Sequence, residues 1–225
     1  MGRDLVSRMQ TDQTVFTADT AGRSALASKL IQKDHLDDMY LRHVDHFNKV
    51  LAAASAGIRS NEDLSAVLPI NFAIDAQPDV PRNLTWAFDS HAQVAAFTLV
   101  IAGKDAKGNS ITDTFTAADG WAGATAKAYA TITSIQLTAR TGTGVGDTMD
   151  FGSGSLLGLA NDLAAAGDVF KVAKSLAAGN SADYPAASYV VDATNDTVDV
   201  STGAAIVDGD SFTIWYKTDL HNLIA

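Results

Sequence analysis

One stretch decides the fold class: Phe97-Thr-Leu-Val-Ile-Ala-Gly-Lys-Asp-Ala-Lys-Gly-Asn-Ser-Ile-Thr-Asp-Thr-Phe115. Two runs rich in β-branched and aromatic residues, 97–102 and 110–115, flank the polar segment 103–109. Glycine readily adopts the positive φ angles of tight turns, and this segment has a glycine near each end. The stretch therefore predicts a β-hairpin.

Short runs of the same kind continue on both sides of this hairpin, separated by Gly, Asn, Asp and Pro. They are 66–74, 83–88, 130–139, 148–151, 169–176, 188–191 and 197–200, followed by the alternating Phe212, Ile214 and Tyr216. The turn-forming residues 192–196 predict a second hairpin. Residues 58–225 are therefore expected to form a mainly β body, a β-sandwich or barrel-like fold.

The acidic residues support a body rich in turns. The chain has 26 acidic residues, of which only Glu62 is Glu, and Asp favours turns and caps over helix interiors. Residues 1–57 carry equal numbers of acidic and basic residues, so the body carries the whole formal charge of −10. An acidic body repels phosphate, so we expect no nucleic-acid partner.

Several classes of protein are disfavoured by what the sequence lacks. There is no Cys, so disulfides and thiolate metal sites are excluded. No apolar run approaches the length of a membrane span, and residues 1–30 lack the apolar core of a signal peptide. We therefore expect a soluble protein that is made in the cytoplasm and has no membrane partner.

The N-terminal quarter has a different pattern. Residues 1–33 are polar and predict an extended or poorly ordered arm. Residues 34–57 predict one long amphipathic helix, with Asp34 as N-cap and Gly57 as terminator. Its apolar side chains recur every three or four residues. They are Leu36, Met39, Tyr40, Val44, Phe47, Val50, Leu51 and Ala54.

The candidate chemical sites are weak. His43 and His46 could form a two-histidine metal site, but no third ligand follows at helical spacing, and two boundary histidines explain them as well. The glycines of 141–147 lack the phosphate-loop pattern and predict a β-turn. The oxygen-rich Asp192–Asp199 segment lacks EF-hand spacing and predicts a hairpin turn.

No nucleophile, base and orienting group converge in the pattern, so we expect no enzyme, no metal and no cofactor. Trp86, Trp121 and Trp215 could line a sugar-binding face, or could be core and interface residues.

Several segments together resemble virion structural proteins of tailed bacteriophages. These segments are Pro81-Arg-Asn-Leu-Thr85, the 97–115 hairpin, Gly146-Asp-Thr-Met-Asp-Phe-Gly152, Leu156-Leu-Gly-Leu159, Asp168-Val-Phe-Lys-Val172 and Asp210-Ser-Phe-Thr-Ile-Trp-Tyr216. The resemblance covers residues 80–217 and leaves out the segment before Gly57. Proteins of this kind decorate or cement capsids, or build parts of the tail, and the resemblance brings no catalytic residues.

The expected function is therefore that of a capsid decoration or cement protein located in the virion. Its expected partners are the major capsid protein or other virion proteins, and its own copies, with a trimer as the expected oligomer. The alternatives are a tail-tube or other tail component, and a carbohydrate-binding or adhesion module. The expected subunit-interaction residues are Val15, Phe16, Met39, Tyr40, Val44, Phe47, Val50 and Leu51.

Overall fold

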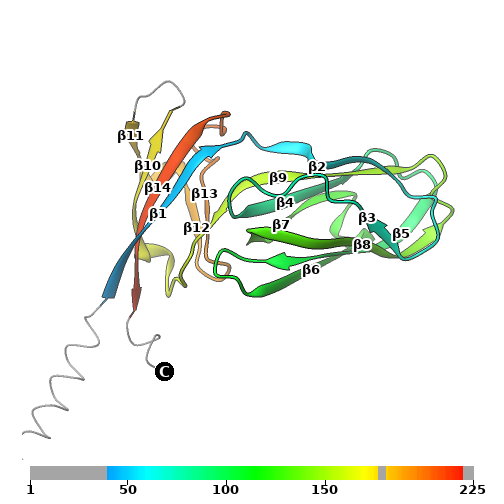
Figure 1. Ribbon diagram of the computed structural model, residues 1–225, viewed down its shortest axis with the longest axis horizontal. Coiled ribbons are helices and arrows are strands. Elements are labelled where there is room, and N and C mark those ends of the chain that lie inside the picture. The colour runs from blue at the N-terminus through cyan, green and yellow to red at the C-terminus, as the bar shows by residue number, and fades with distance from the viewer. Residues whose placement is uncertain (1–39, 177–180, 220–225) are drawn as a thin grey trace, which may run out of the picture. The chain divides into compact units, whose positions relative to one another are not determined.

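The computed structural model describes residues 40–176 and 181–219, and it is mainly β (Figure 1). Strands make up 59% of it and helical residues 5%. Within it, Arg42–Thr218 form one compact unit. The mainly β prediction is therefore confirmed. The expected arm, with Val15 and Phe16, lies outside the described residues, as does Met39.

The first sheet contains the hairpin predicted from residues 97–115. Its strands follow the order β3 (Ile70–Phe72), β8 (Thr131–Gly142), β5 (Val94–Lys104) and β6 (Ser110–Thr116). The β5–β6 register runs without a shift from Thr98 opposite Thr116 to Lys104 opposite Ser110. The turn between them is built on Asp105, whose carboxylate accepts the backbone N–H groups of Lys107 and Asn109 at 2.9 and 2.8 Å.

The second sheet is built around the long strand β9 (Thr148–Gly158). Its order is β12 (Val190–Asp192), β13 (Thr197–Asp199), β9, β4 (Arg82–Phe88) and β7 (Ala122–Tyr129), with β2 (Ala54–Asp63) also paired to β9. The β12–β13 pair is the second predicted hairpin. Asp192 stabilises its turn by accepting the backbone N–H of Thr194 at 2.9 Å.

The third sheet follows the order β1 (Tyr40–Val50), β14 (Asp210–Asp219), β10 (Val169–Ser175) and β11 (Ser181–Tyr184). The predicted alternation in the last strand is confirmed, because Phe212, Ile214 and Tyr216 are all at most 1% exposed. Three short 3-10 turns complete the described elements: Ala117–Asp119, Ala166–Asp168 and Ala186–Ser188.

Two hydrophobic cores lie between these sheets, and β9 contributes to both. Met149 and Phe151 belong to the first core, together with Trp86, Leu99 and other residues of β4, β5 and β8. Leu157, at the other end of β9, belongs to the second core, which the third sheet lines with Phe212 and its neighbours. One continuous strand therefore joins the two cores.

The prediction of a long helix over residues 34–57 is wrong. Residues 40–50 form β1 and 54–63 form β2, so Gly57 lies inside a strand rather than ending a helix. The misleading feature is a backbone irregularity at Lys49, where φ is 53°. A positive φ interrupts the alternation of a strand, so Phe47 and Val50 both reach the second core although they are three residues apart. A three-residue apolar spacing is typical of a helix, but here it reflects this bend.

Buried Arg82 connects elements that meet at the middle of β9. Its side chain is 0% exposed, and its Nε and Nη2 both donate to the carbonyl of Gly154, with an Nε distance of 2.8 Å. Its Nη1 donates to the carbonyl of Leu51 and to a carboxylate oxygen of Asp79, each at 2.9 Å. The guanidinium therefore joins β4, β9 and the β1–β2 connection.

We expect Arg82→Met to lower the free energy of unfolding by about 2–4 kcal/mol, because it leaves the buried carbonyl of Gly154 without its donors and removes the hydrogen bonds to Asp79 and Leu51. Urea unfolding followed by circular dichroism measures the change. The matched control is Arg59→Met, since Arg59 pairs with Glu62 and Asp75 but its side chain is 30% exposed, and its loss should destabilise the fold much less. Equal losses for the two variants would contradict the role assigned to Arg82.

Candidate interaction surfaces

The outward side of the first sheet carries no charge between its two ends. Phe97, Leu99 and Ile101 point into the first core and are at most 3% exposed, so the alternate positions of β5 point outward. We define the uncharged face by the pairing register, with Thr138 added because it lies in the register irregularity beside Thr98 and donates a hydrogen bond to the Thr98 carbonyl. The face consists of Asn71, Thr98, Val100, Ala102, Thr112, Thr114, Thr116, Ser134, Gln136 and Thr138. None of these ten side chains is ionisable.

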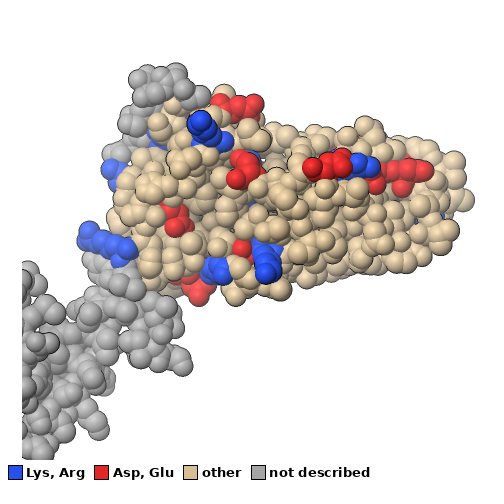
Figure 2. Space-filling view, in the orientation of Figure 1, with Lys and Arg blue, Asp and Glu red and all other residues tan. Residues whose placement is uncertain are grey.

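This lack of charge contrasts with the rest of the body. Residues 58–225 hold nine Lys or Arg and 19 Asp or Glu. Figure 2 shows red and blue groups over the left-hand half and along the top, while the lower border on the right, on the side of β5, β6 and β8, is tan. Interface cores are depleted of charged residues relative to the remaining surface, so this face has the composition of a contact surface.

Part of the polar surface of this face is already hydrogen-bonded within the sheet. Gln136 Nε2 donates to Asn71 Oδ1 at 2.5 Å, and Thr138 Oγ1 donates to the carbonyl of Thr98 at 3.2 Å. These groups would lose little hydrogen bonding if water were removed. Charged residues stand at the two ends of the face. Lys104 is exposed at the end of β5, and Asp119 at the other end binds the hydroxyl of Thr116 at 3.1 Å.

A second candidate surface is the loop end, which consists of residues 64–69, 89–93 and 142–147. Asp147 is 1% exposed and holds the three segments together. Its carboxylate accepts Ser90 Oγ at 2.9 Å and the backbone N–H of Gln93 at 2.7 Å, and its carbonyl accepts the N–H of Leu64 at 3.1 Å. Val67 and Val145 project from this end, 90% and 65% exposed.

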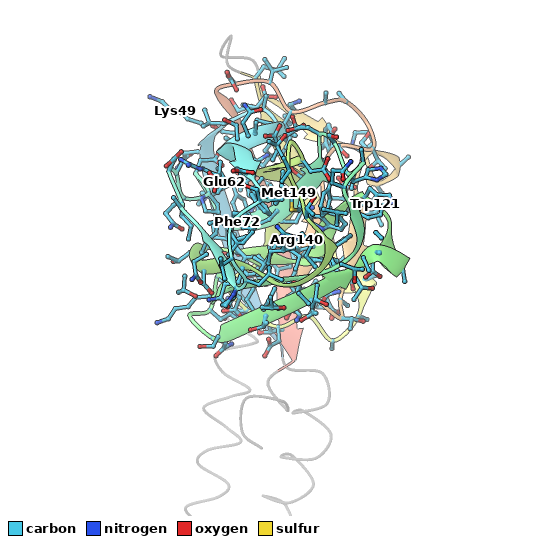
Figure 3. All side chains as sticks on the ribbon, turned by 90° about the vertical axis from the view of Figure 1, so that its right-hand side faces the viewer. Lys49, Glu62, Phe72, Trp121, Arg140 and Met149 are labelled. Carbon is cyan, nitrogen blue, oxygen red and sulfur yellow. The ribbon has the colours of Figure 1, made fainter. Side chains whose placement is uncertain are left out.

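Figure 3 views the same end and shows Arg140 and Met149 near its middle, with Trp121 to one side. The predicted turn at 141–147 is confirmed here: Gly142, Gly144 and Gly146 have φ angles of 106°, 67° and 80°. Because the buried Asp147 forms hydrogen bonds with the other two segments, the loop end is preorganised, and its two exposed valines project from a fixed backbone.

The three tryptophans do not share one surface. Trp86 is 1% exposed in the first core. The ring of Trp121 stacks on His91, with centroids 4.0 Å apart and an angle of 3°. Trp215 lies on β14, in a different sheet, with Lys171 Nζ 5.1 Å from its ring centroid. A sugar-binding platform across all three would require neighbouring, open ring faces, and this arrangement does not provide them.

The subunit-interaction residues predicted from the sequence separate into two groups. Phe47 and Val50 are 5% and 0% exposed in the second core, whereas Val44 and Leu51 are 42% and 53% exposed. Tyr40 begins β1. The strand assignment thus places part of the predicted contact set inside the chain's own core. The uncharged face was not singled out from the sequence, although uncharged residues at alternate positions of 98–102 and threonines at alternate positions of 112–116 were a readable signal.

The histidines considered as metal ligands make hydrogen bonds to β14 and its surroundings. His43 Nε2 lies 2.8 Å from Thr218 Oγ1, its Nδ1 lies 3.2 Å from Asn161 Nδ2, and its ring stacks on Tyr216 at 5.3 Å. His46 Nδ1 lies 3.1 Å from Thr213 Oγ1. Over residues 40–176 and 181–219, no three His, Asp or Glu residues are grouped as a metal site.

A polar cleft lies where the β5–β6 turn meets the loops of the second core. Lys107 donates to Asp162 and to Asp196, the latter at 2.6 Å, and the cleft is also lined by Lys127 and Asn195. Lys127 donates to the carbonyl of Thr112 at 2.7 Å. Both lysines already have partners within the chain. The cleft is therefore best explained as a set of polar contacts that links the two cores.

The hydrogen bonds between Lys107 and the two carboxylates favour the charged form of each partner whose pKa shifts. Burial alone would lower the pKa of Lys107, but its hydrogen bonds to Asp162 and Asp196 outweigh burial and raise it. The hydrogen bond from Lys107 lowers the pKa of Asp162. A lowered carboxyl pKa stabilises the fold above the unfolded value of about 3.9, and a raised lysine pKa stabilises it below about 10.4.

We expect Lys107→Met to lower the free energy of unfolding by about 1 kcal/mol at pH 7, since the pairs are partly exposed. The deficit should be constant between about pH 5 and pH 9 and should shrink as the pH falls below about 4, where the carboxylates become protonated. Urea unfolding across this pH range measures it, with Lys104→Met as control. A deficit that persists undiminished at pH 2.5 would show that Lys107 acts through packing instead of charge.

No protein-family model matches this chain, and neither a curated protein nor a solved structure matches it. Within the described residues, no helix has the length and apolarity needed to cross a membrane.

Proposed function

We propose that this chain is a virion structural protein, and specifically a capsid decoration or cement protein that binds neighbouring subunits and stabilises the shell. The observation that supports this best is the uncharged face on an otherwise acidic β body. The resemblance of residues 80–217 to structural proteins of tailed bacteriophages supports the same role. In this proposal the curled sheets form the sandwich- or barrel-like body of such a subunit.

The proposed partner is the major capsid protein or another virion protein. Two features suit repeated contacts with neighbours: the uncharged face and the loop end with Val67 and Val145. Burying a valine stabilises a contact by about 1.5–3 kcal/mol before entropic costs. Contacts of this size are weak singly, but many copies on one shell act together through high effective concentration. Many weak contacts of this kind are enough to hold a decoration protein on a shell.

A tail-tube or other tail component is the second candidate. It would stack into rings through strand edges and should form rings or tubes when concentrated. A carbohydrate-binding module is the third, and Trp215 is its best remaining residue because Trp86 is buried and Trp121 is covered by His91. Negative-stain imaging of concentrated protein and glycan-array binding by Trp215→Ala, respectively, test these two alternatives.

The proposal predicts that particles made without this protein have a weaker shell. We expect phage particles from a strain with the gene deleted to release their DNA at a lower temperature, and the purified chain to restore the wild-type temperature when added. A DNA-binding dye followed during heating measures the release. Tailless particles from the deletion strain would support the tail role, and particles of unchanged stability and shape would contradict both.

The N-terminal segment can be tested without disturbing any described strand, because β1 begins at Tyr40. If residues 1–33 form an arm that contacts neighbouring subunits, a chain starting at residue 34 should unfold at the same temperature as the full chain but bind empty capsids at least tenfold more weakly. Co-sedimentation with capsids measures the binding. Equal binding by the two chains would show that the arm has no such role.

A further inference from the structure

We infer that the uncharged face pairs with the same face of a second copy of this chain, in an antiparallel face-to-face arrangement. The inference deepens the proposed function and rests on its claim that these subunits pack against one another. Its starting point is the charge distribution. With a formal charge of −10, two copies repel over most of their surfaces. The ten side chains of the uncharged face contribute nothing to that repulsion.

The same-face arrangement follows from the cost of removing water. If the uncharged face met another part of the body, acidic side chains would lose water without gaining a cationic partner. When two copies of the face meet, only hydroxyl, amide and aliphatic groups are desolvated. Gln136, Asn71 and Thr138 already have hydrogen bonds within their own sheet, which lowers that cost further.

The ends of the face determine the orientation. Lys104 stands at the end of β5, in register with Ser110, and Asp119 is held beside Thr116 by hydrogen bonds to its N–H and hydroxyl at 2.7 and 3.1 Å. The two charges therefore lie at opposite ends of the β5–β6 pair. A two-fold axis across the strands places Lys104 of each copy against Asp119 of the other, so two complementary charge pairs form. A parallel arrangement would place like charges together.

The size of the face sets the strength of the contact. Four strands spaced by about 4.8 Å, and about six residues rising 3.3 Å each, give an area on the order of 400 Å². Stable interfaces bury about 800 Å² per partner, so this contact is weak between two free copies. It becomes effective where neighbouring copies are already held close together, as on a shell.

Sedimentation velocity at about 0.15 M salt, where the repulsion between two acidic copies is screened beyond about 8 Å, tests the pairing from about 10 μM to 1 mM protein. We expect wild-type protein to show concentration-dependent dimers and Thr114→Lys to weaken dimerisation at least tenfold, because the two-fold axis brings two like charges together at the middle of β6. Thr114 is exposed on an edge strand, so the variant should unfold at nearly the wild-type temperature. Val190→Lys, which adds the same charge at an exposed site on β12, the end strand of the second sheet, is the matched control and should dimerise like wild type.

A charge exchange tests the orientation. Lys104→Glu and Asp119→Lys should each weaken dimerisation severalfold, and the double variant should regain it, because the pairs are restored with reversed sign. A wild-type chain that stays monomeric up to 1 mM, or equal dimerisation of Thr114→Lys and Val190→Lys, would overturn the pairing. A double variant as weak as the single variants would overturn the antiparallel arrangement. Dimerisation that follows these expectations while deletion particles keep their stability would leave the pairing intact and overturn the decoration role.

Discussion

The buried guanidinium of Arg82 is the constraint on which the arrangement of the strands depends. A fully buried charge is tolerated only where its hydrogen-bonding groups have partners, and here Gly154, Leu51 and Asp79 supply them. The constraint extends to the backbone, since side chains at Gly152 and Gly154 would collide with Ala54 of β2 and Asn83 of β4. β2 and β4 therefore pack closely against the middle of β9, and this close packing fixes their positions on its two sides.

The packing of β2 and β4 against β9 positions both cores and, through the first core, the uncharged face. The register of β4 on β9 places Trp86 opposite Phe151, which fixes the aromatic cluster of the first core. Phe97 and Phe115 pack against Trp86 with ring centroids 5.6 and 5.2 Å away, so they orient β5 and β6 with their alternate side chains outward. A one-residue slip in either strand would turn the threonines inward and expose the aromatic residues. The position of the face is thus a consequence of core packing.

The sequence predicted the elements that local chemistry determines. Both hairpins were predicted because residues within each turn form it. Gly108 adopts a positive φ, and Asp105 and Asp192 each accept a hydrogen bond from a backbone N–H two residues further along, so neither turn depends on distant residues. The helix over 34–57 failed for the opposite reason. β1 is a strand because it pairs with β14, far along the chain, and its apolar spacing is set by the bend at Lys49. Neither fact leaves a local signal.

The candidate surfaces show the same limit. Asp147 was visible only as part of a glycine-rich turn, since its partners Ser90 and Gln93 are more than fifty residues away in sequence. The uncharged face could be anticipated along β5 and β6 from their alternation. Adding Asn71, Gln136 and Thr138 required the pairing of β8 with β3 and β5, which depends on long-range register. Local patterns therefore reveal six of the ten residues of the face, and the other four require the sheet order.

Main-chain pairing at the β6 edge of the first sheet is obstructed at Thr112, and this favours a contact through side chains. An open edge strand would offer its N–H and C=O groups to a strand of another chain. At β6, however, Lys127 occupies the carbonyl of Thr112, and Tyr129 donates its hydroxyl to Asp113 at 2.9 Å. Burial, with the nearby Asp113 charge, raises the pKa of Tyr129, so the hydroxyl remains a donor at any ordinary pH. Since strand addition at β6 would have to displace Lys127 from the Thr112 carbonyl, a neighbour on this side meets the flat outer face of the sheet, where only side chains are offered.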